Sequence, residues 1–435
     1  MKKRIKSIFF ILPVSVLIGI LLLIVVYALP VESARSHVKE SLASMVAAQD
    51  QEIKDPIRRR VYEIKEIFTD VLMVQNALEQ VEGKSVIEHA MYIYHYDLSD
   101  GTTWETEASL GTYLNEGYEG MFLREYSKYW HGYLIWLKPL LICMSWETAE
   151  CIWFIMQVCF LLAVISISIY KKQGYLGIGV GIALLFMKPV RIWISFAMCV
   201  CWGITLLAVL GMLFGYSRLE EKKHQEEFFL IIGILTSYMD FLTYPIVTLG
   251  IPLCVYLVMN MDVSMKWYSR VVKVFWLGVM WGVGYIGMWG MKWVSAEILC
   301  QSGTLRNAVW SVIYRTTPLD GYTSAFSGVS RTIKAVFGQY DNLAYPIGLA
   351  ALVFLAVLTG GVCLIKARNQ NWAASVVCLG VIALLPFAWL ILTQNHTAIH
   401  CWFTFRIMGV TVFALWCMII CSFRTIMRKK RGNGN

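Results

Sequence analysis

The chain has 435 residues, of which 58% are hydrophobic and 15% are charged, and its formal net charge is +9. Soluble globular domains usually carry about 25% charged residues, and the mean hydropathy of this chain, +0.59, is high. This composition excludes an ordinary soluble enzyme and indicates an integral membrane protein.

Ten apolar segments approach or reach the roughly 17 to 25 residues that a helix needs to cross a hydrocarbon core of about 30 Å. The third is short and ends in Lys188-Pro189-Val190-Arg191, so a re-entrant or tilted piece is an alternative there. We predict an all-α integral membrane protein with about ten transmembrane helices and a long outer loop carrying amphipathic helices. The predicted spans are residues 8–29, 148–170, 174–188, 191–215, 227–243, 245–261, 274–294, 344–365, 372–393 and 402–422.

The first segment has the basic start of a signal peptide. Its apolar run, residues 8–29, is longer than the roughly 7 to 15 residues of a signal sequence, and residues 28–32 offer no good cleavage site between small residues. We therefore expect this segment to remain as a membrane anchor.

The basic residues indicate the orientation of the chain, because Lys and Arg in short loops stay on the cytoplasmic side. If Met1 is cytoplasmic, the inner segments hold 19 basic and five acidic residues, a net charge of +14 against +9 for the whole chain. We therefore expect a multi-pass protein of the bacterial plasma membrane with both termini in the cytoplasm. The basic excess is explained by orientation and by attraction to anionic membrane lipids, and it needs no nucleic-acid partner.

This topology leaves two long segments on the outer face, where ATP and nucleotide sugars are absent. The predicted organisation is a first transmembrane anchor at 1–29, an outer loop domain with surface helices at 30–147, a transmembrane bundle at 148–294, a second outer loop at 295–343, and C-terminal transmembrane helices with a basic cytoplasmic tail at 344–435.

In the first outer segment, apolar residues at helical spacing predict an amphipathic helix over residues 56–81. Glu63, Glu66 and Asp70 fall on its opposite, polar face. Such a helix is expected to lie along the membrane surface or to pack on the spans. The apolar positions are Ile57, Val61, Ile64, Phe68, Val71, Leu72 and Leu78.

A dense aromatic stretch at residues 124–134 includes Tyr129, Trp130 and His131. Tyr and Trp at this density are typical of a chain that re-enters the membrane interface. Aromatic rings also stack on the faces of sugars, so the same residues are candidates for a glycan groove.

Asp240 lies near the outer end of the fifth predicted span, and Tyr244 follows one turn later. A carboxylate at this depth must be paired or solvated. One interpretation is an ion pair, and the alternative is a direct role in binding a substrate or a metal. The basic residues available near outer helix ends are Lys188, Arg191 and Lys292.

His396 and His400 precede the last predicted span, and Arg406 lies just inside it. Histidines four residues apart share a helix face and can hold a metal, but the glutamate of the His-Glu-x-x-His zinc motif is missing. Hydrogen-bonded interface histidines are the alternative. Arg406 is a candidate for phosphate, because a guanidinium presents a fork of donors to phosphate oxygens. Its alternative is a side chain that snorkels to the headgroups.

Three motifs carry a resemblance to a known class. They read Tyr-x-x-Tyr-Trp-His-Gly-Tyr at 126–133, Asp-Phe-Leu-Thr-Tyr-Pro at 240–245, and Asn-His-x-x-x-His-x-Trp-Phe-Thr-Phe-Arg at 395–406. With its long first outer loop and short inner loops, the chain resembles the GT-C class of membrane glycosyltransferases. More narrowly, it resembles a set of uncharacterised multi-span bacterial proteins with a GT-C-like layout, over most of its length.

GT-C membership implies transfer of a sugar from a polyprenyl-phosphate carrier to an envelope glycan or lipid acceptor on the outer face. A carboxylate then acts as general base on the acceptor hydroxyl, and a cation stabilises the departing lipid phosphate. The catalytic acid of the class is usually an aspartate soon after the first span. Here the first outer acid is Glu32, a departure that leaves Glu32 and Asp70 as candidates.

For a glycosyltransferase of this kind we predict that Arg406, His396 and His400 bind the lipid phosphate and that Asp240 and His131 shape the acceptor site. The resemblance implies no certain cofactor and leaves a divalent metal open. Two alternatives remain: a transporter or flippase of lipid-linked saccharide, which internal repeats would favour although none is seen, and a non-catalytic envelope assembly protein. The other candidate substrate-binding residues are Asp240, Tyr244, His131, Tyr129 and Trp130.

Overall fold

The computed structural model describes residues 2–46, 67–100, 106–221, 224–263, 265–301, 303–317, 325–340, 342–366 and 370–432. Over these residues the chain is almost entirely helical, with one sheet of two short strands, which confirms the all-α prediction. The elements are α1 (Lys2–Tyr27), α2 (Glu32–Val46), α4 (Ile67–Leu78), α5 (Val86–Tyr92), β1 (Tyr94–Asp97), α6 (Thr106–Glu116), β2 (Phe122–Glu125), α7 (Leu134–Cys143), α8 (Trp146–Tyr170), α9 (Gly174–Phe186), α10 (Pro189–Ile194), α11 (Phe196–Glu221), α12 (Gln225–Met239), α13 (Val247–Met259), α14 (Trp267–Cys300), α15 (Thr304–Thr316), α16 (Ala325–Phe337), α17 (Ala344–Lys366), α18 (Gln370–Leu392), α19 (Gln394–Ile399), α20 (Cys401–Thr404), η1 (Phe405–Ile407) and α21 (Met408–Gly432).

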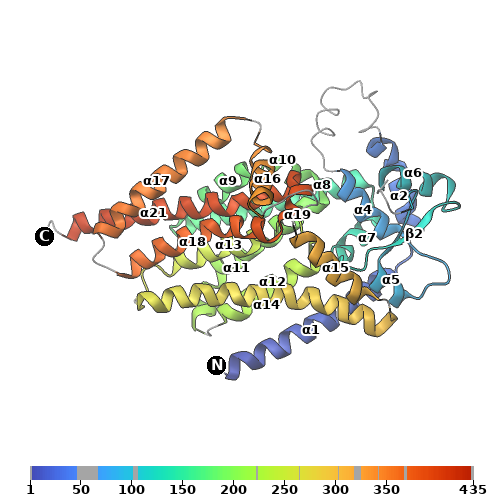
Figure 1. Ribbon diagram of the computed structural model, residues 1–435, viewed down its shortest axis with the longest axis horizontal. Helices are drawn as coiled ribbons and strands as arrows, with labels where there is room; N and C mark the ends of the chain where they lie inside the picture. The colour runs from blue at the N-terminus through green and yellow to red at the C-terminus, as the bar shows by residue number, and fades with distance from the viewer. Residues whose placement is uncertain are drawn as a thin grey trace.

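The helices form an elongated bundle with a small domain at one end, shown at the right of Figure 1. The small domain is the described part of residues 32–143 and contains α2, α4, α5, α6, α7 and both strands. Both chain termini lie away from it, toward the left of the picture. We call the two ends of the bundle the domain end and the tail end.

Seven helices among the described residues are long and apolar enough to cross a membrane. They fall on seven of the ten predicted spans and identify a protein that crosses the bilayer several times. The seven segments are Phe9–Tyr27, Trp146–Tyr170, Phe196–Gly215, Trp267–Cys300, Ala344–Ile365, Trp372–Leu392 and Cys401–Ile426.

The other three predicted spans correspond to shorter helices, so the count of ten is not confirmed. Helices α9, α12 and α13 have 13, 15 and 13 residues. At a rise of 1.5 Å per residue they are about 20 to 22 Å long, less than a hydrocarbon core of about 30 Å. Most of α12 and α13 is buried in the bundle, so their apolar side chains face other helices rather than lipid.

Helices α12 and α13 form a hairpin whose turn approaches the domain end. At the tail end, Lys273 Nζ of α14 lies 2.8 Å from Glu226 Oε1 in the first turn of α12. At the other end of the hairpin, His396 Nε2 of α19 lies 2.9 Å from the carbonyl oxygen of Leu242. Because α12 has only 15 residues, the turn that follows it lies inside the bundle. There the carbonyl of Leu242 holds His396 of α19.

Helices α12 and α14 pack with their backbones in close contact, because a glycine of each faces the other helix. A Cβ atom on Gly233 would lie 2.1 Å from the carbonyl oxygen of Trp281, and one on Gly284 would lie 2.2 Å from that of Leu230. Small residues permit this approach between helices in membranes. The contact fixes α14, which continues past the hairpin to the small domain (Figure 1).

The predicted amphipathic helix is present in part as α4, while Glu63 and Glu66 lie outside the described residues. Residues 69–78 of α4 are all buried, so α4 does not lie along the membrane surface and Asp70 is not on a solvated polar face. The alternative, a helix that packs on the spans, is the one found, because α4 contacts α11. The Asp70 carboxylate accepts hydrogen bonds from Ser195 Oγ and from the backbone N–H of Ala197, both at 2.9 Å. These groups stand at the start of α11, where unpaired N–H groups favour an anion.

The small domain is also fastened to α14. Lys292 Nζ donates to the carbonyl oxygens of Ala90 and Met91 at 3.0 Å each, at the C-terminal end of α5, where a helix leaves carbonyls unpaired. Beyond α5, β1 and β2 pair antiparallel with Tyr94 opposite Glu125. This pairing brings the end of β2 close to α14 and α15.

Candidate functional site

A cavity of about 720 Å³, the first cavity, lies where the small domain, α15 and α19 meet. The end of β2 and the loop after it form one wall, and α15 forms another. The third wall comes from α19 and from His400, the residue that caps its C-terminal end. The lining residues are Glu125, Lys128, Asn307, Trp310, Ser311, Tyr314, Arg315, His396, Ile399 and His400.

Two cations and one carboxylate give this cavity an excess of positive charge. Burial and the nearby Arg315 cation lower the pKa of Lys128, while Glu125 acts in the opposite direction. Within the described ranges, neither Lys128 nor Arg315 has a carboxylate at ion-pair distance. Two cations held close together without such a partner favour binding of an anion.

Aromatic side chains hold the Arg315 guanidinium and the backbone of Lys128 in place. The guanidinium of Arg315 lies 5.2 Å from the ring centroid of Tyr129, and this ring stacks on Trp289 at 5.8 Å. The carbonyl oxygen of Lys128 accepts hydrogen bonds from the indole N–H groups of Trp289 at 2.8 Å and Trp293 at 3.0 Å. The cation–π contact and these bonds preorganise the site.

The two predicted histidines lie side by side in the cavity wall. Their ring centroids are 4.7 Å apart, and the His400 ring stacks on Phe403 at 5.2 Å. Burial, with the Arg315 cation nearby, lowers the pKa of His400 to about 4. Burial also lowers the pKa of His396, and its neighbours His400 and Arg315 act in the same direction. Both rings are therefore neutral at pH 7.

An apolar strip borders the first cavity on α15. Trp310 and Tyr314 line the cavity and are also 64% and 58% exposed. The adjoining face of the same helix exposes Leu305, Val309 and Ile313 at 44%, 49% and 44%. A cationic cavity therefore opens beside a surface suited to the membrane interface.

Arg406 does not line this cavity. Its side chain is completely buried in η1, where one guanidinium nitrogen donates to the carbonyl oxygen of Trp402 at 3.0 Å. The guanidinium also lies 4.7 Å from the ring centroid of Phe405. A buried guanidinium does not snorkel, so this alternative is wrong. The cation that stands beside the histidines is Arg315.

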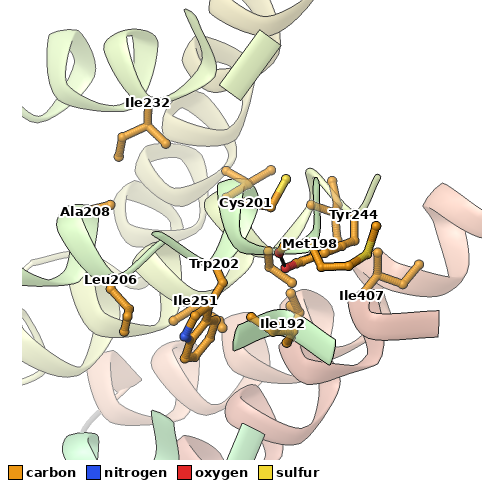
Figure 2. Close-up of a cluster of buried hydrophobic side chains, with 14 of the residues drawn as sticks. Ile192, Met198, Cys201, Trp202, Leu206, Ala208, Ile232, Tyr244, Ile251 and Ile407 are labelled. Carbon is orange, nitrogen blue, oxygen red and sulfur yellow. Dashed lines mark hydrogen bonds between the residues drawn. The ribbon is translucent and has the colours of Figure 1, made fainter. Parts of the chain in front are cut away.

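Asp240 is buried in the turn between α12 and α13 and accepts hydrogen bonds from the hydroxyl and the backbone N–H of Thr243. Among the described contacts it has no basic partner, and Lys292 is bound to the end of α5 instead, so the predicted ion pair is not found. Tyr244 is completely buried, and its hydroxyl points to the carbonyl of Met198 in the apolar cluster of Figure 2.

The residues of the aromatic stretch lie behind the first cavity. Trp130 is completely buried and donates to the carbonyl of Met288 at 2.7 Å. His131 bridges Tyr133 Oη at 2.9 Å and the carbonyl of Tyr126 at 3.0 Å. Burial lowers the pKa of His131 to about 3, so it is neutral. These residues, with Tyr129, shape the loop that presents Lys128.

Neither predicted general base lies at the cavity. Asp70 caps α11, and Glu32 is an exposed residue at the start of α2 whose carboxylate accepts from the backbone N–H of Val31 at 3.1 Å. The carboxylate that does line the cavity is Glu125. Glu125 is exposed at the surface, but partial desolvation by the cavity walls raises its pKa, and the Lys128 cation opposes this shift.

The two histidines do not form a metal site with a third ligand. In the part of the chain that the structure describes, no group of three or more His, Cys, Asp or Glu is placed to hold a metal ion. His396 uses its Nε2 nitrogen for the carbonyl of Leu242. The alternative of interface histidines therefore fits His396.

Most residues that line the first cavity were not among the predicted site residues. Lys128 and Glu125 lie within the aromatic stretch at residues 124–134, where the candidates were Tyr129, Trp130 and His131. Trp310, Tyr314 and Arg315 belong to the second predicted outer loop. In that loop the helical spacing of Leu305, Val309 and Ile313 indicates an interfacial helix, and Arg315 lies outside its apolar face. The sequence alone does not bring this helix to β2.

No family model matches this chain, and no curated protein or solved structure matches it.

Proposed function

We propose that the chain is a GT-C-like glycosyltransferase that moves a sugar from a polyprenyl-phosphate carrier to a glycan or lipid acceptor at the first cavity. The observation that carries this proposal is a cavity with two cations, two aromatic rings and a carboxylate, bordered by an exposed apolar strip. These features match the parts of one amphiphilic donor: phosphate, sugar ring and lipid chain.

The cations fit a phosphate. Arg315 offers a planar fork of donors, and Lys128 a point charge. Trp310 and Tyr314 present ring faces on which a sugar can stack. The exposed side chains of Leu305, Val309 and Ile313 on the adjoining face would rest in the membrane interface, where a lipid-linked donor arrives.

Glu125 is proposed as the general base in place of Glu32 and Asp70. It removes the proton of the acceptor hydroxyl as that oxygen bonds to the anomeric carbon of the sugar. The bond from this carbon to the phosphate oxygen breaks, and its electron pair leaves with the lipid phosphate. Arg315 and Lys128 stabilise the charge that develops there. A raised pKa makes Glu125 a stronger base than an ordinary glutamate.

The location of this reaction is proposed to be the outer face of the bacterial plasma membrane. The basic segments flank the tail end of the bundle, and positive charge marks the cytoplasmic side. The first cavity then faces out. A lipid-linked donor is consistent with this location, because nucleotide sugars are absent there.

The proposal is tested with the purified full chain and a panel of radiolabelled polyprenyl-phosphate sugars, measuring the transfer of label to acceptor. Arg315→Gln should lower kcat/KM by at least about a hundredfold, the usual effect of removing one preorganised charge donor. Arg306→Gln is the matched control, because Arg306 is an exposed residue of the same helix that does not line the cavity.

Two results would overturn the proposal. One is unchanged transfer by Arg315→Gln. The other is no transfer by the unmodified chain with any donor, together with saturable movement of saccharide-lipid across vesicles, which would favour a flippase.

A further inference from the structure

A second cavity, of about 530 Å³, lies within the small domain and shares no residue with the first. One wall is the first half of α2, and the other is the end of α6 with the residues after it. The chain that follows α4 completes it. The lining residues are Arg35, Ser36, Lys39, Gln80, Glu82, Tyr113, Leu114, Gly117 and Tyr118.

A stack of four planar groups forms part of this cavity. The guanidinium of Arg35 lies 5.3 Å from the ring centroid of Tyr113. Tyr96 stacks on Tyr113 at 6.0 Å and on Tyr118 at 5.0 Å, with interplanar angles of 20° and 11°. Tyr118 ends the stack and is 49% exposed. One face of the Tyr118 ring therefore packs on Tyr96, which fixes its orientation, and the other face is open to a ligand.

Two cations of α2 stand on the same side of the cavity. Arg35 is oriented by a hydrogen bond from its Nε to the carbonyl oxygen of Leu78 at 3.2 Å, which leaves its two terminal nitrogens for a ligand. The buried Glu79 carboxyl lies near this guanidinium, but burial raises the pKa of Glu79 to about 8, so at pH 7 it is mainly protonated and does not neutralise Arg35. Lys39 is four residues later on the same helix face and is exposed. Gln80 and Ser36 add hydrogen-bonding groups around the rim. Glu82 is the one carboxylate among the lining residues, so the two cations leave this cavity with a net positive charge.

We propose that the second cavity binds an acidic saccharide, with a sugar ring on the exposed face of Tyr118 and its carboxylate or phosphate paired with Arg35 and Lys39. An aromatic face attracts the positively polarised C–H edge of a sugar, and a guanidinium matches an anionic oxygen pair. Among the described residues that line the second cavity there is no exposed apolar strip like that of the first cavity, so a glycan fits it better than a lipid headgroup. This binding does not depend on the transfer reaction.

The test uses the full chain in nanodiscs of neutral phospholipid and measures binding by calorimetry. The probes are a hyaluronan hexasaccharide, which carries uronates, and a neutral chitohexaose. Hyaluronan should bind more tightly. Lys39→Ala should weaken it about tenfold and leave chitohexaose unchanged, whereas Tyr118→Ala should weaken both about three- to tenfold. Both substituted residues are exposed, so the variants are expected to fold, and gel filtration checks this.

Two control variants place the site. Lys84→Ala removes an exposed lysine of the same domain that pairs with Glu88 at 3.1 Å outside the cavity, and Arg315→Gln alters the first cavity. Neither should change hyaluronan binding. The proposal fails if hyaluronan does not bind at millimolar concentration, if Arg315→Gln abolishes binding, or if the chain binds anionic vesicles through Lys39 and ignores both saccharides.

Discussion

Two buried charged residues, Asp70 and Lys292, join the small domain to the bundle through contacts at helix ends. Asp70 binds the N-terminal end of α11, and Lys292 binds the C-terminal end of α5. From the sequence, Asp70 was expected in solvent and Lys292 was a candidate partner of Asp240. Helical periodicity shows on which face of a helix a charged residue lies. It does not show that main-chain groups of a distant segment will form hydrogen bonds with that residue. Both interpretations therefore failed for the same physical reason.

Glu79 gives a pH-dependent contribution to stability. It is buried beside Tyr113, and burial raises its pKa from 4.5 to about 8. The folded state then holds a proton that the unfolded state releases, so this contribution is full below pH 4.5 and is lost as pH rises to about 8. Glu79→Gln cannot lose a proton, so the variant should become more stable than the unmodified chain over this pH range.

Thermal unfolding in detergent at pH 5 and pH 8 measures this effect, because the difference between the two proteins cancels the titration of other groups. The melting temperature of Glu79→Gln relative to the unmodified chain should be higher at pH 8 than at pH 5. An equal difference at both pH values would show that Glu79 does not titrate there.

At the scale of elements, hydropathy predicted the seven long apolar helices. It did not show that the shorter helices α12 and α13 are buried among other helices. Helices α12 and α13 are apolar because other helices surround them, and an apolar helix in a protein interior has the same composition as one in lipid. Their hairpin supports His396 at the wall of the first cavity. Both predicted histidines therefore line a cavity, but the residues around them depend on a packing arrangement that hydropathy does not encode.

The contact between α12 and α14 should be sensitive to a single methyl group. Gly284→Ala places a Cβ against the backbone of α12, and the helices must separate, at a cost of about 1 to 3 kcal/mol. The melting temperature in detergent should fall by several degrees. Gly282→Ala is the control, because no atom lies within 4 Å of its added Cβ. Equal melting temperatures for the two variants would contradict the close contact.

The whole molecule places the first cavity, the second cavity and the small domain at one end of the bundle. The charge distribution predicts that this end lies outside the cell and that the tail end is cytoplasmic. The sequence could supply this prediction because orientation depends on summed charge in loops, not on precise contacts. The two cavities could not be predicted from the sequence, because each is formed by elements that are distant along the chain. The first lies between β2, α15 and α19, and the second between α2 and α6.

Cysteine labelling of intact cells with a membrane-impermeant maleimide tests the orientation. Glu119→Cys, in the small domain, should react in intact cells, while Lys171→Cys, between α8 and α9, should react only after permeabilisation. Both positions are exposed, and the unmodified chain serves as the blank for its own cysteines. Labelling of Lys171→Cys alone in intact cells would reverse the topology and remove the argument for an extracellular lipid-linked donor.

The indole groups of Trp289 and Trp293, which both donate to the carbonyl of Lys128, also make this loop observable by spectroscopy. In nitrogen-15-labelled protein, the two indole N–H resonances should move together when a phosphate-bearing ligand draws Lys128 toward it. The indole of Trp281, on the same helix, donates to Thr248 inside the bundle at 3.0 Å and provides an internal reference. Ligand screening would then need no enzymatic assay.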